Sequence, residues 1–320
     1  MATRIYQLDY LKCIFIILMI IFHLAYIGDK YPYAKHIVYT FHMSAFLLIS
    51  GYLVNVQKGN KQFLFSVFWI FMPYAIMETG YTMMSALLPV REKVSDMTFS
   101  LLLHKIFIAP LGPYWYLHTL MICYMTYYVG YKICLRKSKV SLLILLGICF
   151  WILSDWLKLL SMGNAFYFLL GILISQCKQH FTSIFQSSFW AILPFIMLCC
   201  YPENLNRFSL AGVAISYLSI SFSLWVYCHI PCKMKQIMHF IGSNTLTILL
   251  FSPIFTMLSK LILPLFAFDP TGMCFMCIAT AFSIAGSLFI AQCMDRLKLS
   301  HWLCGRDTML NMEKEYPVSI

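Results

Sequence analysis

The chain has 320 residues, of which 61% are hydrophobic and 11% are charged, and 23 Lys and Arg against 12 Asp and Glu give a formal charge of +11. Globular proteins are about 45–50% apolar and about 25% charged, so this composition excludes a soluble enzyme, a disulfide-stabilised secreted protein and a disordered chain. In so apolar a chain, the basic excess indicates cytoplasmic loops rather than nucleic-acid binding. We expect an all-α polytopic integral membrane protein that contacts the lipid bilayer and no nucleic acid.

Ten apolar segments are candidates to cross a hydrocarbon core about 30 Å thick as helices. In chain order they are 10–27, 36–56, 63–88, 113–133, 139–159, 164–178, 183–201, 209–229, 237–261 and 272–294. Pro73, Pro194 and Pro253 fall inside three of these segments and should kink them. The stretch 99–108, within the outer connection 89–112, is too short to span and is expected to lie on the membrane interface.

The distribution of basic residues sets the expected orientation. With the N-terminus inside, fifteen Lys and Arg residues fall on the inner side and eight on the outer side. Basic residues collect in cytoplasmic loops, so both termini are expected in the cytoplasm. We expect a membrane-embedded domain over residues 1–294 and a polar cytoplasmic tail over residues 295–320, with the protein in a cell membrane.

Metal binding has little support in the sequence. Cys274 and Cys277 form a C-x-x-C pair inside an apolar segment, but no second pair accompanies it. The histidines in the apolar segments lack the paired spacing typical of zinc ligands. We therefore expect no metal site.

Ionisable side chains inside the apolar segments are the candidate functional residues, because each costs on the order of 2.5–3.5 kcal/mol to place there. A helical rise of about 1.5 Å per residue puts His23, His42, His118 and Asp155 roughly 6–9 Å below the outer surface, and Glu78 roughly 15 Å deep. Such a layer predicts a polar chamber open to the outside. Structural hydrogen bonding remains an open alternative for Glu78, Asp155 and His118.

The first segment places two of its polar residues on one face. Lys12 and His23 are eleven residues apart, which brings a helix back to within about 20° and separates the two side chains by about 16 Å. Lys12 would lie at the cytoplasmic entrance and His23 in the outer layer. Asp9, three residues before Lys12, can pair with it.

Four motifs occur in order along the chain. The first segment has Lys12, ten residues and then His23; the second reads Phe41-His42-Met43-Ser44-Ala45-Phe46 and continues to Ser50-Gly51-Tyr52-Leu53. Pro113-Tyr114-Trp115-Tyr116-Leu117 and Phe240-Ile241-Gly242-Ser243-Asn244-Thr245-Leu246 follow. Together they resemble the membrane acyltransferase-3 family, and most closely its branch of fucose 4-O-acetylases and polysaccharide O-acetyltransferases. Ser44 departs from a common family Pro, and Ser252 lies near a position where the family often has His.

The resemblance implies an enzyme of the bacterial cytoplasmic membrane and cell envelope. It would transfer an acyl group, most often acetyl, from cytoplasmic acyl-CoA to a hydroxyl of a sugar or glycan, free or lipid-linked. Acetyl-CoA or another acyl-CoA is then a substrate, and no bound cofactor is expected. His23 would act as general base, since imidazole titrates near neutrality. His42 would orient His23, bind the acceptor or stabilise the oxyanion.

Further roles follow from the same resemblance. Lys12, with Arg4, would hold the CoA phosphates, while Tyr52, Trp115 and Tyr116 would contact the sugar. Asp9, Glu78, His118 and Asp155 would support the site. Packing or lipid contact is an open alternative for the aromatic residues, and direct transfer and an acyl-His intermediate on His23 both stay open.

Two other functions remain in play. A transporter or flippase of a glycan precursor would also carry intramembrane charges and broken helices, although no inverted repeat is visible. An inactive family member could serve as a partner in glycan assembly, and Ser252 in place of a family His keeps that alternative open. The acceptor, the acyl chain and the oligomeric state are not specified by the sequence.

Overall fold

The computed structural model describes residues 4–87, 97–134 and 138–311, and these residues form helices and connections with no β-strand among them. The chain divides into two compact units. Unit 1 comprises Met1–Phe46, His180–Ser300 and Arg306–Ile320, and unit 2 comprises Leu47–Gln179 and His301–Gly305. The expected division into residues 1–294 and a tail of residues 295–320 stays a prediction.

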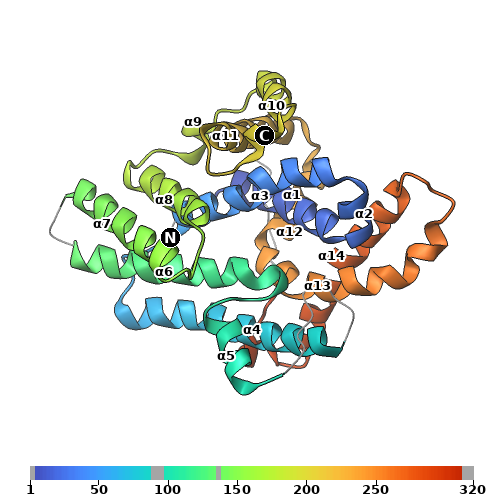
Figure 1. The fold of residues 1–320 in the computed structure, drawn as a ribbon, viewed down its shortest axis with the longest axis horizontal. Helices are drawn as coiled ribbons and strands as arrows, with labels where there is room; N and C mark the ends of the chain where they lie inside the picture. The colour runs from blue at the N-terminus through green and yellow to red at the C-terminus, as the bar shows by residue number, and fades with distance from the viewer. Residues whose placement is uncertain (1–3, 88–96, 135–137, 312–320) are drawn as a thin grey trace. The chain divides into compact units, whose positions relative to one another are not determined.

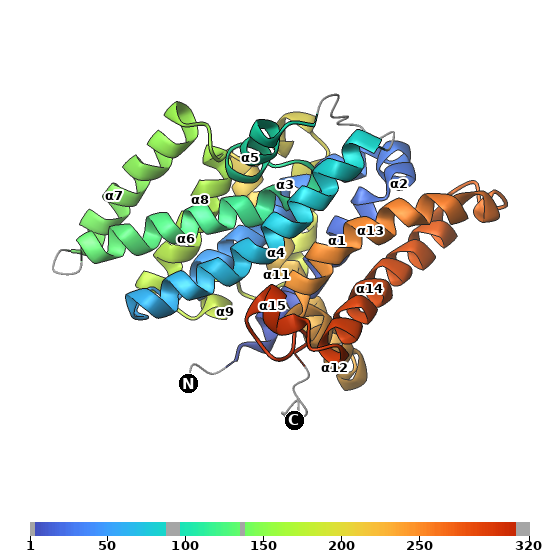
Figure 2. The same cartoon turned by 90° about the horizontal axis from the view of Figure 1, so that it is seen from below.

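Unit 1 is built around its first helix. α1 packs against α11, α12, α13 and α14, and α13 and α14 run side by side in Figures 1 and 2. The middle of α1 is apolar and buried at Leu11, Phe15 and Ile16. The helices of this unit are α1 (Tyr6–His23), α2 (Ala25–Lys30), the first part of α3 (Pro32–Leu53), α9 (Phe181–Ile184), α10 (Ile192–Cys199), α11 (Leu210–His229), α12 (Cys232–Ser243), α13 (Thr245–Ile262) and α14 (Met273–Arg296).

Unit 2 has α6 at its centre. α6 (Trp115–Ile133) packs against α4 (Asn60–Leu87), α7 (Lys139–Trp151) and α8 (Met162–Gln176), and Figure 1 shows it in green beside α4 and α7. The short α5 (Phe99–Phe107) packs on α4, and residues of α15 (Ser300–Cys304) complete the unit.

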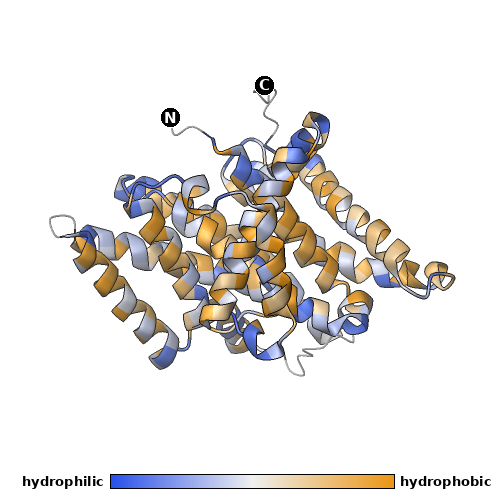
Figure 3. Ribbon diagram, turned by 90° about the horizontal axis from the view of Figure 1, so that it is seen from above, coloured by the Kyte–Doolittle hydropathy of each residue, from blue (hydrophilic) through white to orange (hydrophobic). Residues whose placement is uncertain are grey.

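The helices have the length and composition of a multi-pass membrane protein. Seven described helices are long and apolar enough to span a bilayer, or eight if α5 and α6, bent by 41° at their junction, form one broken span. Two shorter apolar helices lie at Met162–Gln176 and Phe189–Cys199. Apolar residues dominate the long helices, and polar residues gather near their ends (Figure 3). Each expected segment overlaps one of these helices, whereas the count of ten spans and the cytoplasmic termini stay predictions.

The first helix ends earlier than expected. The segment 10–27 was expected to be continuous, but α1 stops at His23 and Leu24 adopts an extended conformation before α2 begins. Leu24 and Ile27 are buried in a cluster with Phe275 and Ala279 of α14. The turn at Leu24 therefore buries apolar side chains that a straight helix would direct elsewhere, and it leaves His23 as the last residue of α1.

The expected segment 237–261 is likewise two helices. α12 ends at Ser243, and Asn244 separates it from α13. The Asn244 amide donates to the Phe240 carbonyl oxygen at 2.8 Å. Asn side chains that bond to nearby backbone compete with helix continuation, which explains the break.

Other local expectations can be placed on the structure. Pro73 and Pro253 lie inside α4 and α13 as expected, and Pro194 lies inside α10. The stretch 99–108 forms α5, which is amphipathic with Phe99 and Phe107 exposed. Residues 89–96 of the expected outer connection and 312–320 of the expected tail lie outside the described residues.

Two glycines allow α3 and α8 to touch within unit 2. A Cβ on Gly171 would lie 2.1 Å from the Leu48 carbonyl oxygen, and one on Gly51 would lie 2.1 Å from the Phe168 carbonyl oxygen. These distances are far below a van der Waals contact, so any side chain would force the helices apart. Small residues at such crossings are a common means of helix association in membranes.

We predict that Gly171→Ala destabilises the protein by about 1–3 kcal/mol, as overpacking of a close interface does. The measurement is the apparent melting temperature of the detergent-solubilised protein. Gly147→Ala is the matched control, because a Cβ there meets nothing within 4 Å, and Ala favours a helix over Gly. Equal melting temperatures for the two variants would contradict the close contact.

Candidate functional site

Two histidines with the same local geometry lie at one end of unit 1. Nδ1 of His23 is 2.7 Å from the Met19 carbonyl oxygen, and Nδ1 of His42 is 2.7 Å from the Val38 carbonyl oxygen. A carbonyl oxygen only accepts, so each Nδ1 carries a proton and donates it. In the neutral ring, Nε2 then presents its lone pair, which is the form required of a base.

The two rings differ in their access to solvent. His23 is exposed at the end of α1, whereas His42 is only 2% exposed and its Nε2 has no hydrogen-bond partner among the described residues. Tyr39 lies between them, with ring centroids 6.2 Å from His23 and 5.2 Å from His42. The Tyr39 hydroxyl donates to the Phe22 carbonyl oxygen at 3.4 Å. We call this group of His23, Tyr39 and His42 the histidine end of unit 1.

A distant part of the chain is fastened beside His42. Thr40 Oγ1 donates to the Leu205 carbonyl oxygen at 2.9 Å, and the Tyr33 hydroxyl donates to the Cys199 carbonyl oxygen at 2.6 Å. These bonds hold α10 and the following turn η4 (Pro202–Leu205) against α3. Arg207 follows this turn after Asn206.

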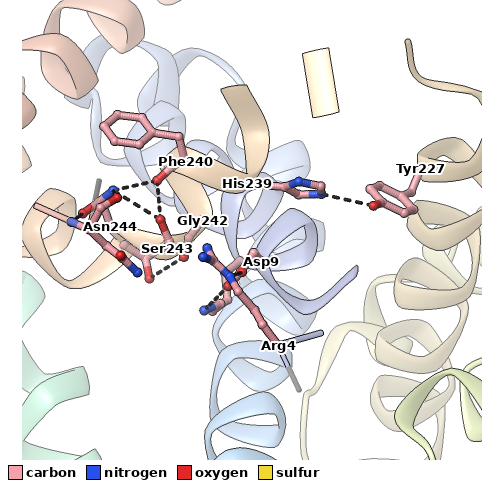
Figure 4. Close-up of polar contacts among 11 residues, drawn as sticks. Arg4, Asp9, Tyr227, His239, Phe240, Gly242, Ser243 and Asn244 are labelled. Carbon is pink, nitrogen blue, oxygen red and sulfur yellow. Dashed lines mark hydrogen bonds and ion pairs between the residues drawn. The ribbon is translucent and has the colours of Figure 1, made fainter. Parts of the chain in front are cut away.

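The opposite end of α1 carries a buried carboxylate between two cations (Figure 4). Asp9 is 6% exposed; its Oδ2 lies 2.6 Å from Arg4 Nε and its Oδ1 lies 2.7 Å from Lys12 Nζ. The backbone at Asp9 touches α12, since a Cβ on Gly242 would lie 1.8 Å from the Asp9 carbonyl oxygen. We call this region the basic end of unit 1.

Aromatic rings and a third cation extend the basic end. Tyr227 is hydrogen-bonded to His239 Nε2 at 3.1 Å, as Figure 4 shows, and the Lys235 ammonium lies 4.8 Å from the Tyr227 ring centroid. The Tyr6 ring lies 5.1 Å from the His239 ring. Burial holds the pKa of His239 below its usual range, with Asp9 acting in the opposite direction. This region holds three cations, Arg4, Lys12 and Lys235, and one carboxylate, Asp9.

The last described residues are hydrogen-bonded near the basic end. Asn244 Oδ1 accepts from the Asn311 backbone N–H at 2.8 Å. Asp295 accepts from the backbone N–H groups of Met309 and Leu310 at 2.6 and 3.1 Å. Residues 309–311 are thus fixed near α12, at the end of unit 1 where α1 begins.

His118, expected in the same polar layer as His23, and Glu78, expected below that layer, hold backbone groups in unit 2. Glu78 is fully buried and its Oε1 accepts from the Leu111 N–H at 2.5 Å. His118 Nε2 donates to the Phe107 carbonyl oxygen at 2.9 Å. Tyr74 completes the set by donating to the Ile106 carbonyl oxygen at 2.7 Å. Together they fasten the connection between α5 and α6, which favours the structural alternative for Glu78 and His118.

The remaining expected residues also belong to unit 2. The Tyr116 hydroxyl lies 3.0 Å from Ser50 Oγ, the Tyr52 hydroxyl donates to the Gln179 carbonyl oxygen at 3.5 Å, and Trp115 makes an edge contact with Tyr116. Asp155 is exposed in a π-helical turn, Ile152–Trp156. Contacts to a sugar by these residues stay predictions.

Sequence reasoning missed several neighbours of the candidate residues. Lys35 and Tyr39 precede His42 by seven and three residues, a helical spacing that could have placed them on its face. Arg207 had no such signal, because the chain before it is brought to α3 only by the tertiary hydrogen bond from Thr40 to Leu205. The same holds for Tyr227 and His239 at the basic end.

One helix, α1, connects the basic end to the histidine end. Cations suited to phosphate lie at the start of α1, and an imidazole suited to proton transfer lies at its end, about 16 Å away along the axis. His23 and His42 come together with Tyr39, and Arg4, Asp9 and Lys12 come together with one another. No group of three potential metal ligands occurs among the residues that the structure describes.

Comparison with known proteins gives one match. A model of the acyltransferase-3 family, described as an acyltransferase domain, matches residues 5–292. No curated protein and no solved structure matches the chain. The matched range contains both ends of unit 1 and all of the candidate residues except Arg4.

We predict that Glu78→Leu lowers the apparent melting temperature by several degrees, because it leaves the buried Leu111 N–H without its acceptor at a cost of about 1–3 kcal/mol. Glu78→Gln keeps an acceptor oxygen and serves as the matched control. Thermal unfolding in detergent checks both. A Gln variant as unstable as the Leu variant would contradict the role assigned to this hydrogen bond.

Proposed function

This chain belongs to the acyltransferase-3 family, and we propose that it is an O-acyltransferase of the cell membrane. It transfers an acyl group, acetyl in the first instance, from acyl-CoA to a hydroxyl of a sugar or cell-surface glycan. The observation that carries the proposal is the pair of imidazoles at the histidine end, each held by Nδ1 with Nε2 left for chemistry.

His23 is the general base of this reaction. A sugar hydroxyl must lose its proton as it attacks the thioester carbonyl, and a positioned imidazole accelerates such a step by about 10²–10⁴-fold. The exposed His23 ring can meet an acceptor that arrives from solvent. Its Nδ1 bond to Met19 holds the ring in the tautomer that a base requires.

His42 serves the same reaction from a buried position. Its Nε2 lacks a partner among the described residues, so a bound molecule can supply one. The ring is suited to hold the acceptor hydroxyl, or, when protonated, to stabilise the oxyanion that forms at the thioester carbonyl oxygen.

The donor binds at the basic end. Arg4 and Lys12 share the Asp9 carboxylate, which fixes both side chains, and the excess of positive charge suits the CoA phosphates. The extended pantetheine arm then follows α1 toward His23. The proposed donor site requires the basic end to face the cytoplasm, where acyl-CoA is found.

The topology that accompanies this proposal has ten spans and two cytoplasmic termini, in a bacterial cytoplasmic membrane. Asp9 at the start of α1 and Asn311 near the described end of the chain both lie at α12. A chain that begins and ends on one side of a membrane crosses it an even number of times, which is compatible with ten crossings, and equally with eight.

We predict that His23→Ala lowers acyl transfer by at least about a hundredfold, as loss of a general base does. The measurement is the acetyl ester content of surface and lipid-linked glycans in cells that express matched membrane levels of each protein. His229→Ala is the control, because His229 is also exposed and makes the same Nδ1 bond to a carbonyl four residues back. Unchanged esters in His23→Ala cells would remove His23 as the base.

Release of CoA from acetyl-CoA distinguishes this proposal from its alternatives. Purified protein should release CoA from acetyl-CoA in the presence of glycan, whereas a transporter, a flippase or an inactive assembly partner should not. One CoA released per protein without acceptor would identify an acyl-His intermediate, and release only with acceptor would identify direct transfer.

We predict that Lys12→Gln raises the KM for acetyl-CoA by about tenfold or more with a smaller change in kcat, because a charge-assisted contact to phosphate contributes about 1.5–3 kcal/mol to binding. Steady-state kinetics of the reconstituted protein checks the change. Lys58→Gln, at an exposed lysine of unit 2, should match the wild type. A fall in kcat alone would place Lys12 outside the donor site.

A further inference from the structure

The basic end contains a series of three aromatic rings in contact, with a cation against the first ring and another against the last. The Tyr6 and His239 ring centroids lie 5.1 Å apart, and the His239 and Tyr227 centroids lie 5.7 Å apart. The Arg4 guanidinium carbon lies 5.5 Å from the Tyr6 ring centroid, and the Lys235 ammonium lies 4.8 Å from the Tyr227 centroid. We call these five residues the aromatic series.

Three helices of unit 1 hold the aromatic series together. Tyr6 is the first residue of α1, and Tyr227 lies on α11. Lys235 and His239 are four residues apart on α12, a spacing that places them on one face of that helix. α1 packs against both α11 and α12, and the hydrogen bond between Tyr227 and His239 joins α11 to α12 (Figure 4). The position of Lys235 is therefore set by tertiary packing.

The cations of the basic end are not equivalent. Arg4 and Lys12 share the Asp9 carboxylate, so this group carries one net positive charge. Lys235 makes no ion pair with a carboxylate of the described residues, and its ammonium lies against the Tyr227 ring instead. The basic end thus has two centres of positive charge, one organised by Asp9 and one at Lys235.

The nucleotide of acyl-CoA also carries its charge in two places. A pyrophosphate is attached to the 5′ side of the ribose, and a separate phosphate is attached to the 3′ oxygen. The proposed reaction has so far used Arg4 and Lys12 for the CoA phosphates and has left Lys235 without a role. An ammonium is a compact charge well suited to a phosphate. The half-buried rings of Tyr6 and Tyr227 keep some surface that an adenine base can stack on.

We propose that the basic end recognises the donor nucleotide at both phosphate positions, with Arg4 and Lys12 on the pyrophosphate and Lys235 on the ribose 3′-phosphate. Lys235 is then the residue that distinguishes acyl-CoA from a thioester without the 3′-phosphate, and the Tyr227 ring holds its ammonium in place. The inference deepens the proposed function and rests on it for the transfer step alone, because nucleotide binding can be measured without turnover.

The first test measures binding of CoA and dephospho-CoA, which differ only in the 3′-phosphate. Each is titrated into the full-length protein in detergent, and its dissociation constant is obtained from the rise in melting temperature. We expect CoA to bind about tenfold or more tightly than dephospho-CoA, as one charge-assisted contact to phosphate provides.

Variants of α12 show whether Lys235 is the source of this preference. Lys235→Gln should weaken the binding of CoA alone and bring the ratio of the two dissociation constants close to one, while Lys235→Arg should retain a preference for CoA. Lys233→Gln is the matched control, because Lys233 is exposed and lies two residues earlier, about 200° around the same helix. It removes the same charge and should keep the wild-type ratio.

The second test measures acetyl transfer from acetyl-CoA and from acetyl-dephospho-CoA by the reconstituted protein. We expect the wild type to prefer acetyl-CoA by about tenfold or more in kcat/KM, mainly through KM. In Lys235→Gln, the KM for acetyl-CoA should rise to the value for acetyl-dephospho-CoA, with kcat close to that of the wild type.

The possible results separate the 3′-phosphate contact from the function beneath it. Equal binding of CoA and dephospho-CoA by the wild type would overturn the contact and leave acyl transfer intact. Equal weakening of both ligands by Lys235→Gln would also overturn it and make Lys235 a support for Tyr227. An equal loss of preference in Lys233→Gln would attribute the preference to net charge. A preference for CoA that only Lys235→Gln abolishes, without any acetyl transfer, would uphold the contact and reject the acyltransferase.

Discussion

Burial of α1 is the constraint on which unit 1 depends. Four other helices pack against it, and its middle is filled by Leu11, Phe15 and Ile16. On such a helix a polar group needs a partner or an exposed position, and α1 provides these near its two ends. The carboxylate of Asp9 is accordingly satisfied by neighbours on the first turns, and His23 emerges where Leu24 turns the chain away. The distance between the cations at one end of α1 and His23 at the other is therefore set by the length of apolar helix that the surrounding helices bury.

The helical segments were predictable because their signal is local. A run of about 20 apolar residues is enough to predict a membrane helix, and every expected segment overlaps an observed helix. The break at Leu24 was not predictable, since its cause lies far along the chain: Leu24 turns toward Phe275 on α14, and the residues around it have the composition of a continuous helix. The break at Asn244 has a local cause in the bond from its amide to the Phe240 carbonyl oxygen. Gly242, Ser243 and Asn244 were a local signal that the prediction of segment 237–261 did not use.

The candidate residues also differ in whether the sequence could identify them. His23 and His42 could be selected from sequence, because a polar side chain in an apolar segment is costly and the pair fits a family motif. Glu78 and His118 satisfy the same criterion, yet they hold the backbone of the Ile106–Leu111 connection. The energetic cost of burial identifies a buried polar group, but it does not distinguish a residue that makes a structural hydrogen bond from one that takes part in chemistry. Arg207 could not be selected at all, since its position beside α3 depends on a hydrogen bond between residues 40 and 205.

The hydrogen bond from Nδ1 to the main chain limits how a histidine can take up and release protons. A histidine tied in this way has one working nitrogen, so a proton taken up by Nε2 has to depart from Nε2 as well. In the proposed reaction, the proton that His23 Nε2 takes from the acceptor hydroxyl passes to the departing CoA thiolate or, because the residue is exposed, to water once the product has left. The ring of His42, 2% exposed, has no comparable outlet. Of two side chains with the same local hydrogen bond, exposure favours His23 as the one that can return to its neutral form after each cycle of the proposed reaction.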